Sequence, residues 1–381
     1  MKNTTVLISG AGIAGPSLAL WLDRAGCRVT VVEKAPAPRS GGQAVDFKGA
    51  THLAVLERMG VLDEVRRRQT GGGDQTVIDA DGRALTVIPG EFTGGELEIR
   101  RGDLAALLCE RTPGCEYVHG DTITSLTETA DGVHVTFDRG APRTFDLVVG
   151  ADGIHSNVRR LVFGPETDHV RFLGHHYALA TTDVSVAKPV MYNEPGRMLA
   201  VGGPKADAFL VFASEPLDYD RYDPAQQKAL LRNAFRDGGW RMSEVVDGLT
   251  DVYLDSISRV EVDRWSRGRV VLLGDSAFGN TLGGFGTGLA VVGAYVLAGE
   301  LVAAAGDHRV AFARYEEKFR PYAGISRNGN AGPFLAPRTR LGIRARNLLF
   351  QSPVLLRSML WMTDRFATRI ELDDYPALTS L

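Results

Sequence analysis

The most informative segment of the sequence lies close to the N-terminus, where residues 4–34 read TTVLISGAGIAGPSLALWLDRAGCRVTVVEK. An apolar run rich in β-branched residues (residues 5–9) precedes three glycines spaced G-x-G-x-x-G, and apolar residues at helical spacing follow them. A second apolar run then ends at Glu33. This order predicts a strand, a tight loop, a helix and a second strand, the β-α-β unit whose loop binds a dinucleotide.

Each part of this unit has a physical role. Gly10 permits the tight turn, Gly12 lets the backbone approach a pyrophosphate, and Gly15 lets the helix pack closely on the sheet. The helix N-terminus offers unpaired N–H groups to phosphates, and Glu33 can accept hydrogen bonds from a ribose 2′-hydroxyl. The loop therefore predicts a bound dinucleotide and leaves FAD and NAD as alternatives. The expected contacts in this unit are Gly10, Gly12, Ile13, Ala14, Gly15, Glu33 and Lys34.

Two later segments repeat the arrangement of a buried strand that ends in an acidic residue. Residues 145–164 read FDLVVGADGIHSNVRRLVFG and carry Asp152, and residues 268–301 begin GRVVLLGDSAFGNTLGGFG and carry Asp275. Ligands of open α/β sheets bind outside the carboxyl ends of the strands. The three strand ends are therefore expected to converge on one extended ligand.

The ordered set of G-x-G-x-x-G, Asp-Gly and Gly-Asp motifs resembles the class A flavoprotein monooxygenases. This family includes p-hydroxybenzoate hydroxylase, the aromatic polyketide hydroxylases and the tetracycline-inactivating monooxygenases. The resemblance runs from residue 4 to about residue 330. It implies FAD as the dinucleotide and an α/β fold with a Rossmann-like FAD-binding domain, an inserted antiparallel-sheet substrate domain and C-terminal helices.

The resemblance also implies roles for single residues. Glu33 would hold the adenosine ribose, Arg101 in RRGDLAALL would contact the flavin end, Asp152 would support the pyrophosphate loop, and Asp275 would bind ribityl hydroxyls. The segment RSGGQAVDFKG would line the flavin and the approach of the nicotinamide. The further expected cofactor contacts are Arg39, Asp46, Leu104, Gly153, Arg159, Gly274, Gly286, Gly288 and Leu289.

The third motif departs from the family pattern. Phe278 stands where the family commonly has a histidine, a proline is missing, and the following helix begins GGFGTGLA. Gly284, Gly286 and Gly288 keep the close backbone approach, so the helix dipole can still stabilise negative charge on a reduced flavin.

The motifs divide the chain into three parts. Alternating apolar and polar segments in the middle of the chain predict an antiparallel sheet. A substrate would lie between this sheet and the flavin, although ordinary core packing is the alternative for each candidate side chain. These candidates are His176, Tyr177, Met198, Phe209 and Phe212. The expected parts are an FAD-binding domain (1–71, 99–165 and 268–335), a substrate-binding domain (72–98 and 166–267) and a C-terminal helical segment (336–381).

By resemblance, NAD(P)H reduces FAD, O₂ forms a flavin C4a-hydroperoxide, and one oxygen atom passes to an aromatic or polycyclic small molecule. We assign no catalytic side chain, because the flavin carries the chemistry. Two other functions stay open, because a fold does not fix a reaction. One is a flavin-dependent reductase or dehydrogenase, and the other is a non-catalytic protein that binds flavin or ligand.

Composition sets further limits. The net charge of −3 predicts no global attraction to nucleic acid. Three cysteines without a Cys-x-x-Cys pattern predict neither a disulfide framework nor a metal site. The longest apolar stretch, LAVVGAYVLAGELVAAA, contains Glu300, so a buried helix is expected and not a membrane span. The first residues lack a signal-peptide pattern, and we expect a cytoplasmic protein.

Overall fold

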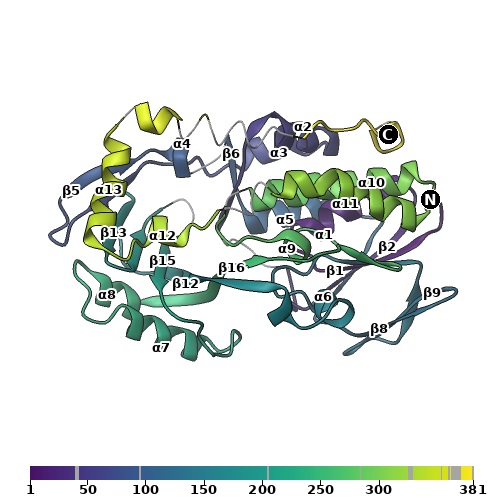
Figure 1. The fold of residues 1–381 in the computed structure, drawn as a ribbon, viewed down its shortest axis with the longest axis horizontal. Coiled ribbons are helices and arrows are strands. Elements are labelled where there is room, and N and C mark those ends of the chain that lie inside the picture. The colour runs from purple at the N-terminus through teal and green to yellow at the C-terminus, as the bar shows by residue number, and fades with distance from the viewer. Residues whose placement is uncertain are drawn as a thin grey trace.

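The computed structural model describes residues 1–381 except 39–42, 94–95, 204–205, 284, 325–328, 353, 359–360, 362–369 and 380–381. Two large sheets lie side by side along the long axis (Figure 1). Both ends of the chain lie beside the first sheet, at the right in the figure.

The first large sheet has a mostly parallel core. Within the described residues it contains six strands in the order β17-β18-β11-β1-β2-β7, and only β17 pairs antiparallel. Val6, Leu7 and Ile8 are fully buried, as expected for a strand covered on both faces. The strands are β1 (Thr5–Ser9), β2 (Arg28–Glu33), β7 (Glu116–His119), β11 (Leu147–Gly150), β17 (Ser266–Arg267) and β18 (Val270–Leu272).

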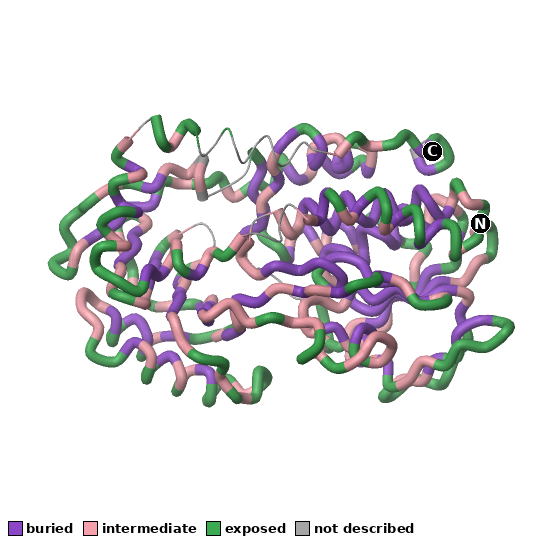
Figure 2. The backbone as a smooth tube through the Cα atoms, in the orientation of Figure 1, coloured by how far each residue is buried: buried purple, intermediate pink, exposed green. Residues whose placement is uncertain are grey.

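Helices cover this sheet and fill its core. α1 (Ala14–Arg24) packs against α10 (Gly286–Ala303), and α10 packs against α11 (His308–Ala323). α10 is long and apolar enough to cross a membrane, but 78% of it is buried inside the protein. Figure 2 shows the buried residues concentrated in this layer. The expectation of a buried core helix is confirmed.

Shorter elements surround the first sheet. β3 (Ala44–Phe47) pairs with β6 (Leu97–Arg100), and β8 (Ile123–Thr129), β9 (Gly132–Phe137) and β10 (Arg143–Phe145) form a small antiparallel sheet. The helices of this part are α2 (Gly49–Met59), α3 (Leu62–Arg67), α5 (Arg101–Glu110), α6 (Asn157–Val162) and α9 (Asp275–Phe278), with a 3-10 turn at Glu166–Asp168.

The second large sheet is mainly antiparallel. Its described strands follow the order β16-β12-β15-β14-β13-β4-β5, and only β13 and β4 pair in parallel. β4 and β5 come from residues 72–98 and join strands from residues 166–267. The strands are β4 (Gln75–Ile78), β5 (Ala84–Ile88), β12 (Val170–Thr182), β13 (Val190–Glu194), β14 (Arg197–Val201), β15 (Ala208–Ala213) and β16 (Leu249–Val260).

The two faces of this sheet have different neighbours. One face packs on α7 (Pro224–Ala234) and α8 (Met242–Asp247). The other packs on α12 (Gly332–Leu335), α13 (Arg340–Gln351) and Phe92 of α4 (Gly90–Thr93). The chain ends with α15 (Pro376–Thr379) beside α10. The expected α/β fold, with a Rossmann-like domain, an antiparallel sheet and C-terminal helices, is confirmed.

Candidate functional site

The glycine loop between β1 and α1 shows why two of its glycines are needed. Gly10 has φ +106°, and a Cβ there would lie 2.4 Å from the carbonyl oxygen of Ala151. A Cβ on Gly15 would lie 1.9 Å from the carbonyl oxygen of Gly10. These two residues bring the helix and β11 close to the loop. Gly12 differs, because a Cβ there would meet only the Arg101 guanidinium, at 3.5 Å, so its backbone faces open space.

Glu33 at the end of β2 is joined to this loop. Its carboxylate accepts hydrogen bonds from the backbone N–H groups of Ala11 and Ala35, both at 2.8 Å. A carboxylate has about four acceptor positions, so it can accept further bonds from a ribose. Lys34 next to it contacts the Tyr222 ring at 4.2 Å and the Tyr222 hydroxyl at 3.0 Å. Ile13 and Ala14 are buried at the start of α1.

The Asp-Gly motif contributes its aspartate to the protein scaffold. The Asp152 carboxylate accepts bonds from the backbone N–H groups of Asn157 and Val158, at 2.9 and 3.0 Å, at the start of α6, whose N-cap residue is Ser156. It also accepts a bond from the Ser276 hydroxyl at 3.1 Å. Asp152 therefore connects the second motif to the third, and its predicted support of the pyrophosphate loop would be indirect.

Gly153 and Arg159 make the same connection. The Gly153 N–H donates to the Ser276 hydroxyl at 3.0 Å, and the buried Arg159 guanidinium donates to the carbonyls of Ser276 and Ile154, at 3.0 and 2.6 Å. Gly153 has φ +84° and no atom within 4 Å of a Cβ position. Open space therefore exists beside Gly153, whereas Arg159 is directed into the protein.

Asp275 has the features of a ligand-binding carboxylate. It follows the strand β18 and Gly274, and its side chain is solvent-exposed. Protein atoms nevertheless lie close enough around the carboxylate for burial to raise its pKa. Among the residues that the structure describes, no side-chain or backbone donor forms a hydrogen bond with it. Hydroxyl donors of a ligand would satisfy this group.

Arg101, at the start of α5, provides the positive charge beside it. Its guanidinium partly offsets the rise in the Asp275 pKa and also acts on the hydroxyls of Tyr177 and Tyr253 on the second sheet. The same guanidinium reaches the open side of Gly12. Arg101 therefore lies where the glycine loop, the third motif and the second sheet meet. Arg100 precedes it as the N-cap residue of α5 and is exposed.

The remaining predicted cofactor contacts differ in their surroundings: some lie near Asp275 or the glycine loop, and others lie in the protein core. Gly286 lies near Asp275, with 3.8 Å between its Cβ position and a carboxylate oxygen. Gly274 has φ +66° and packs against Ala14. Leu104 and Leu289 belong to the core, Asp46 is half-buried on β3, and Arg39 lies outside the described residues.

Gly288 shows a packing reason for a glycine in α10. A Cβ there would lie 2.1 Å from the His52 ring. His52 is fully buried; it accepts a bond from the Lys48 N–H at 3.2 Å and lies 3.1 Å from the Tyr322 hydroxyl. Burial lowers the pKa of His52 to about 4, so the ring is neutral.

The departure at Phe278 also has a structural reason. The ring is buried and packs on Trp265 and Phe319, with centroid distances of 5.0 and 5.3 Å. Phe278 therefore belongs to an aromatic cluster under α11.

The structure separates the five candidate substrate residues. Tyr177, Met198 and Phe209 lie on the face of the second sheet that packs on α12 and α13. Phe212 lies on the opposite face with α7 and α8, and His176 packs on its ring at 5.6 Å. Burial lowers the pKa of His176 to about 4. The geometry therefore does not bring His176 and Phe212 together with the other three.

A hydrogen-bond network that the motifs did not reveal joins the two large sheets. We call Tyr253, Asp255, His155 and Glu166 the intersheet network. The Tyr253 hydroxyl donates to Asp255 at 2.8 Å, and the His155 ring lies 3.1 Å from Asp255 and 2.9 Å from Glu166. Burial alone would lower the pKa of His155, but the hydrogen bonds to both carboxylates outweigh it and the pKa is raised.

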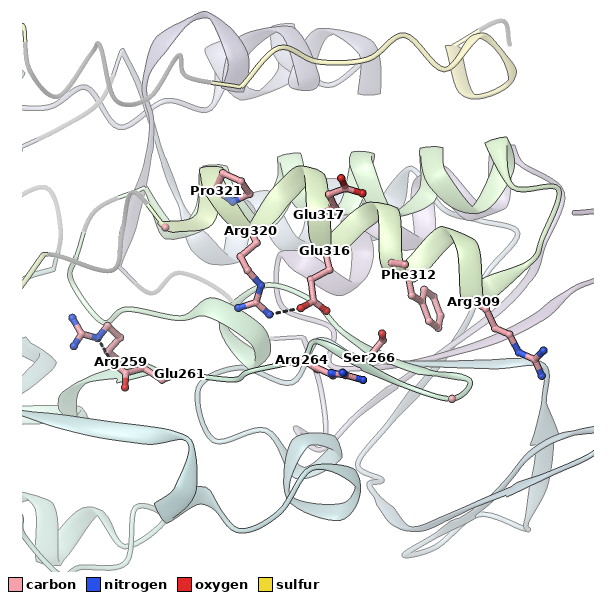
Figure 3. Close-up of a pocket in the computed structure, with 13 residues that line it drawn as sticks. Arg259, Glu261, Arg264, Ser266, Arg309, Phe312, Glu316, Glu317, Arg320 and Pro321 are labelled. Carbon is pink, nitrogen blue, oxygen red and sulfur yellow. Dashed lines mark hydrogen bonds and ion pairs between the residues drawn. The ribbon is translucent and has the colours of Figure 1, made fainter.

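A surface cavity lies elsewhere, between α11 and residues 259–268, with a volume of about 1050 Å³. Figure 3 shows its charged side chains, where Arg320 pairs with Glu316 and Arg259 pairs with Glu261. Gly268 at the start of the third segment is one of the residues that line it, but none of the predicted cofactor contacts lines it. The three motifs, and not this cavity, define the candidate cofactor site.

The donors and acceptors at the motifs fit FAD. Gly12 and Gly153 leave open space at backbone positions, Glu33 can accept further bonds, and Asp275 with Arg101 offers an acceptor and a cation. These groups span a glycine loop at one end and a carboxylate at the other, as an extended dinucleotide requires. In the described ranges, no group of three or more His, Cys, Asp or Glu side chains is placed to hold a metal ion.

Comparisons with known proteins identify the family. Residues 3–323 match the family model described as an FAD binding domain. The chain belongs to this family of flavin-dependent monooxygenases. A flavin-dependent monooxygenase of Legionella longbeachae is 34% identical over 337 residues, which cover 84% of this chain and 86% of the relative.

Other similar proteins extend the same result. An uncharacterized Mycobacterium tuberculosis protein is 40% identical over 342 residues, covering 85% of this chain and 91% of the relative. The crystal structure of tetracycline destructase Tet(55) superposes with a TM-score of 0.82 at 31% identity, covering 98% of this chain and all of that one. The resemblance drawn from the three motifs is confirmed, and this chain is a member of the flavin-dependent monooxygenase family over most of its length.

Proposed function

We propose that this family member binds FAD and uses NAD(P)H and O₂ to hydroxylate an aromatic or polycyclic small molecule. The observation that carries the proposal is that Arg101, which reaches the open side of Gly12, acts electrostatically on the Asp275 carboxylate, for which the described residues provide no hydrogen-bond donor. When bound, FAD would supply electron transfer and oxygen activation, and the protein would supply orientation and electrostatics.

The cofactor contacts would divide between the two ends of FAD. Glu33 and the backbone at Gly12 would hold the adenosine ribose and the pyrophosphate, where the N-terminus of α1 favours negative charge. Asp275 would accept hydrogen bonds from ribityl hydroxyls, and Arg101 would hold the flavin end. Arg101 would also place a fixed positive charge near the ring, which favours negative charge there.

The face of the second sheet that carries Tyr177, Met198 and Phe209 would form the substrate wall. Apolar and aromatic side chains with few polar groups suit a planar, hydrophobic substrate. The tetracycline destructase that shares this fold acts, by its name, on a polycyclic molecule, which favours a substrate of that class. The reductant NAD(P)H and a cytoplasmic location are parts of the same proposal.

The test is a substrate-dependent oxygenation assay with FAD-reconstituted protein. NADPH and NADH oxidation and O₂ uptake would be followed with a panel of phenols and polycyclic aromatics. Mass spectrometry under ¹⁸O₂ would detect a product with one labelled oxygen atom. Labelled product supports the monooxygenase. NAD(P)H oxidation without label favours the reductase or dehydrogenase, and bound FAD that neither nucleotide reduces favours a non-catalytic protein.

A further inference from the structure

Exposed apolar side chains gather at one end of the molecule. Ten large apolar or aromatic side chains are exposed among the described residues, and seven belong to β5 or to the segment 341–361. β5 and α13 lie together at the left end in Figure 1, and α13 packs against β5. These seven are Leu85, Val87, Leu341, Leu348, Val354, Leu355 and Trp361, with exposed fractions from 42% to 77%.

On α13 the exposed residues share one side of the helix. Leu341, Ala345 and Leu348 follow the spacing i, i+4, i+7, and Arg344 lies between the leucines. Leu341 is 77% exposed and Leu348 is 61% exposed, whereas Phe350 and Arg346 on the other side are buried. A helix stripe of this kind normally packs on something, because single domains rarely expose a row of large apolar side chains.

The segment that carries α13 is basic. Residues 330–358 contain five arginines and no Asp or Glu, although the whole chain has a net charge of −3. Arg340, Arg344 and Arg357 are exposed, and within the described part of the chain none of them makes an ion pair. Arg340 and Arg344 lie one turn apart beside the leucines. The face therefore combines apolar side chains with free positive charge. We call Leu341, Leu348, Arg340 and Arg344 the basic apolar face.

We propose that the basic apolar face of α13 docks on an anionic lipid surface. A helix that lies on a membrane buries Leu side chains at the acyl boundary and sets arginines among the headgroups. Arginine suits this place, because its stem stays on apolar surface while the guanidinium reaches the phosphates. This is contact with one leaflet and involves no membrane-spanning helix.

A second copy of this chain fits the face less well. A two-fold interface sets the same patch against itself. Arg340 and Arg344 would then face the same arginines of the other copy, without an acidic residue of this segment between them. The charge therefore selects an acidic partner, and a lipid headgroup layer supplies negative charge over the whole length of the stripe.

Vesicle flotation with the full-length, FAD-reconstituted protein tests the proposal. The probes are vesicles of phosphatidylcholine alone and of phosphatidylcholine mixed with phosphatidylglycerol. We expect binding to the mixed vesicles that falls as salt rises. The doubly substituted protein Arg340→Gln/Arg344→Gln should partition roughly 25-fold less, about fivefold per arginine. Leu341→Gln/Leu348→Gln should also lose binding, because the apolar contact is removed.

Matched controls use α11, where Val310, Arg309 and Arg314 are exposed in a different part of the molecule. Val310→Gln and Arg309→Gln/Arg314→Gln should leave vesicle binding unchanged. Circular dichroism and the flavin content of each variant report folding and cofactor binding independently of lipid. The proposal fails if anionic vesicles bind no more protein than neutral ones, or if the α11 variants lose as much binding as the α13 variants. Self-association that disappears in the leucine variants, without vesicle binding, would assign the face to a second copy instead.

Discussion

Asp275 places a carboxylate among protein atoms without a hydrogen-bond partner on the described residues, and burial raises its pKa. A ligand that donates hydroxyl groups would satisfy it, with about 1.5–3 kcal/mol for each charge-assisted bond. Asp275→Asn should therefore weaken FAD binding by roughly tenfold or more. Fluorescence titration of the apoprotein with FAD measures this, and unchanged affinity in a folded variant would remove the assigned role.

The same substitution, which should weaken FAD binding, should not lower the stability of the apoprotein. A carboxyl whose pKa is raised on folding binds its proton more tightly in the native state, so the native state loses stability as pH rises above the ordinary value of 3.8. Asp275→Asn lacks this loss, and its apoprotein should be at least as stable as the parent at neutral pH. Chemical unfolding without FAD at several pH values would check the sign. A less stable variant would mean that the carboxylate has a structural role.

Arg101 and Arg100 are adjacent in sequence but have different surroundings, so Arg100 serves as a matched control for Arg101. Arg101 reaches the open side of Gly12 and acts on Asp275, whereas Arg100 is the exposed N-cap residue of α5 and its side chain makes no capping hydrogen bond. Arg101→Ala should weaken FAD binding and slow NAD(P)H-dependent reduction of the protein that remains loaded. Arg100→Ala should do neither. Stopped-flow reduction under anaerobic conditions separates the two, and a sensitive Arg100 would show that the alignment of this motif is off by one position.

The raised pKa of His155 in the intersheet network leads us to expect a specific pH dependence of stability. Its pKa is raised, so its contribution is complete below the ordinary value of 6.5 and disappears as pH rises through the folded pKa. Burial alone would raise the pKa values of Asp255 and Glu166, but hydrogen bonds to His155 and other groups lower both. Their contribution is complete above about 4.5, the higher of their ordinary values, and disappears as pH falls through the folded pKa values.

The combined contribution of the network is therefore largest between about pH 4.5 and 6.5. His155→Gln should cost about 1–3 kcal/mol of unfolding free energy in that window and less above it. Denaturant unfolding at pH 5.5 and pH 8.5 measures the difference. An equal cost at both pH values would show that His155 contributes through packing and not through charge.

Among the secondary-structure elements, α10 carries two glycines in its N-terminal turn. Substitutions there can show whether each glycine is needed for packing inside the protein or for the approach of a cofactor. Gly→Ala normally stabilises a helix by about 1 kcal/mol. At Gly288 the new methyl group would lie 2.1 Å from His52, so Gly288→Ala should cost about 1–3 kcal/mol. Gly286→Ala, with 3.8 Å to its nearest neighbour, should cost nothing in the apoprotein. Equal unfolding free energies for the two variants would contradict this packing account.

The sequence predicted the elements that carry local signals. The glycine spacing, the buried strands and Glu33 identified the β-α-β unit, because each local feature there has only a few structural solutions. The antiparallel sheet was predicted from the alternation of apolar and polar residues along its strands. We propose a division into an FAD-binding domain (1–71, 99–165 and 268–335), a substrate-binding domain (72–98 and 166–267) and a C-terminal helical segment (336–381). In the structure, β4 and β5 from residues 72–98 join the second sheet.

Other features could not be predicted, because they depend on pairing between distant segments. His155 and Asp255 are 100 residues apart and meet only through the fold. The adjacent residues His176 and Tyr177 point to opposite faces of β12, and the sequence alone did not say which face turns toward α7 and α8. The glycine at position 288 indicated a close approach, but the neighbour is His52 from the other end of the chain.

At the scale of the whole molecule, the proposed ligand connects residues that are far apart in sequence, from Gly12 to Asp275. A ligand that binds only the folded state stabilises it by about 2.7 kcal/mol at a concentration 100 times its Kd. FAD should therefore raise the thermal midpoint of the apoprotein strongly. FMN, which lacks the adenosine half, should raise it less, because it cannot reach Glu33.

Half-ligands can assign each end of the site separately. ADP carries the adenosine ribose and pyrophosphate, and FMN carries the ribityl chain and the ring. Stabilisation by ADP should decrease in Glu33→Gln and persist in Asp275→Asn, whereas stabilisation by FMN should show the reverse pattern. Thermal scans of both variants with each nucleotide provide the measurement. If FMN matches FAD in the parent protein, or if both variants lose the same half-ligand, the extended arrangement of the three motifs along one dinucleotide is wrong.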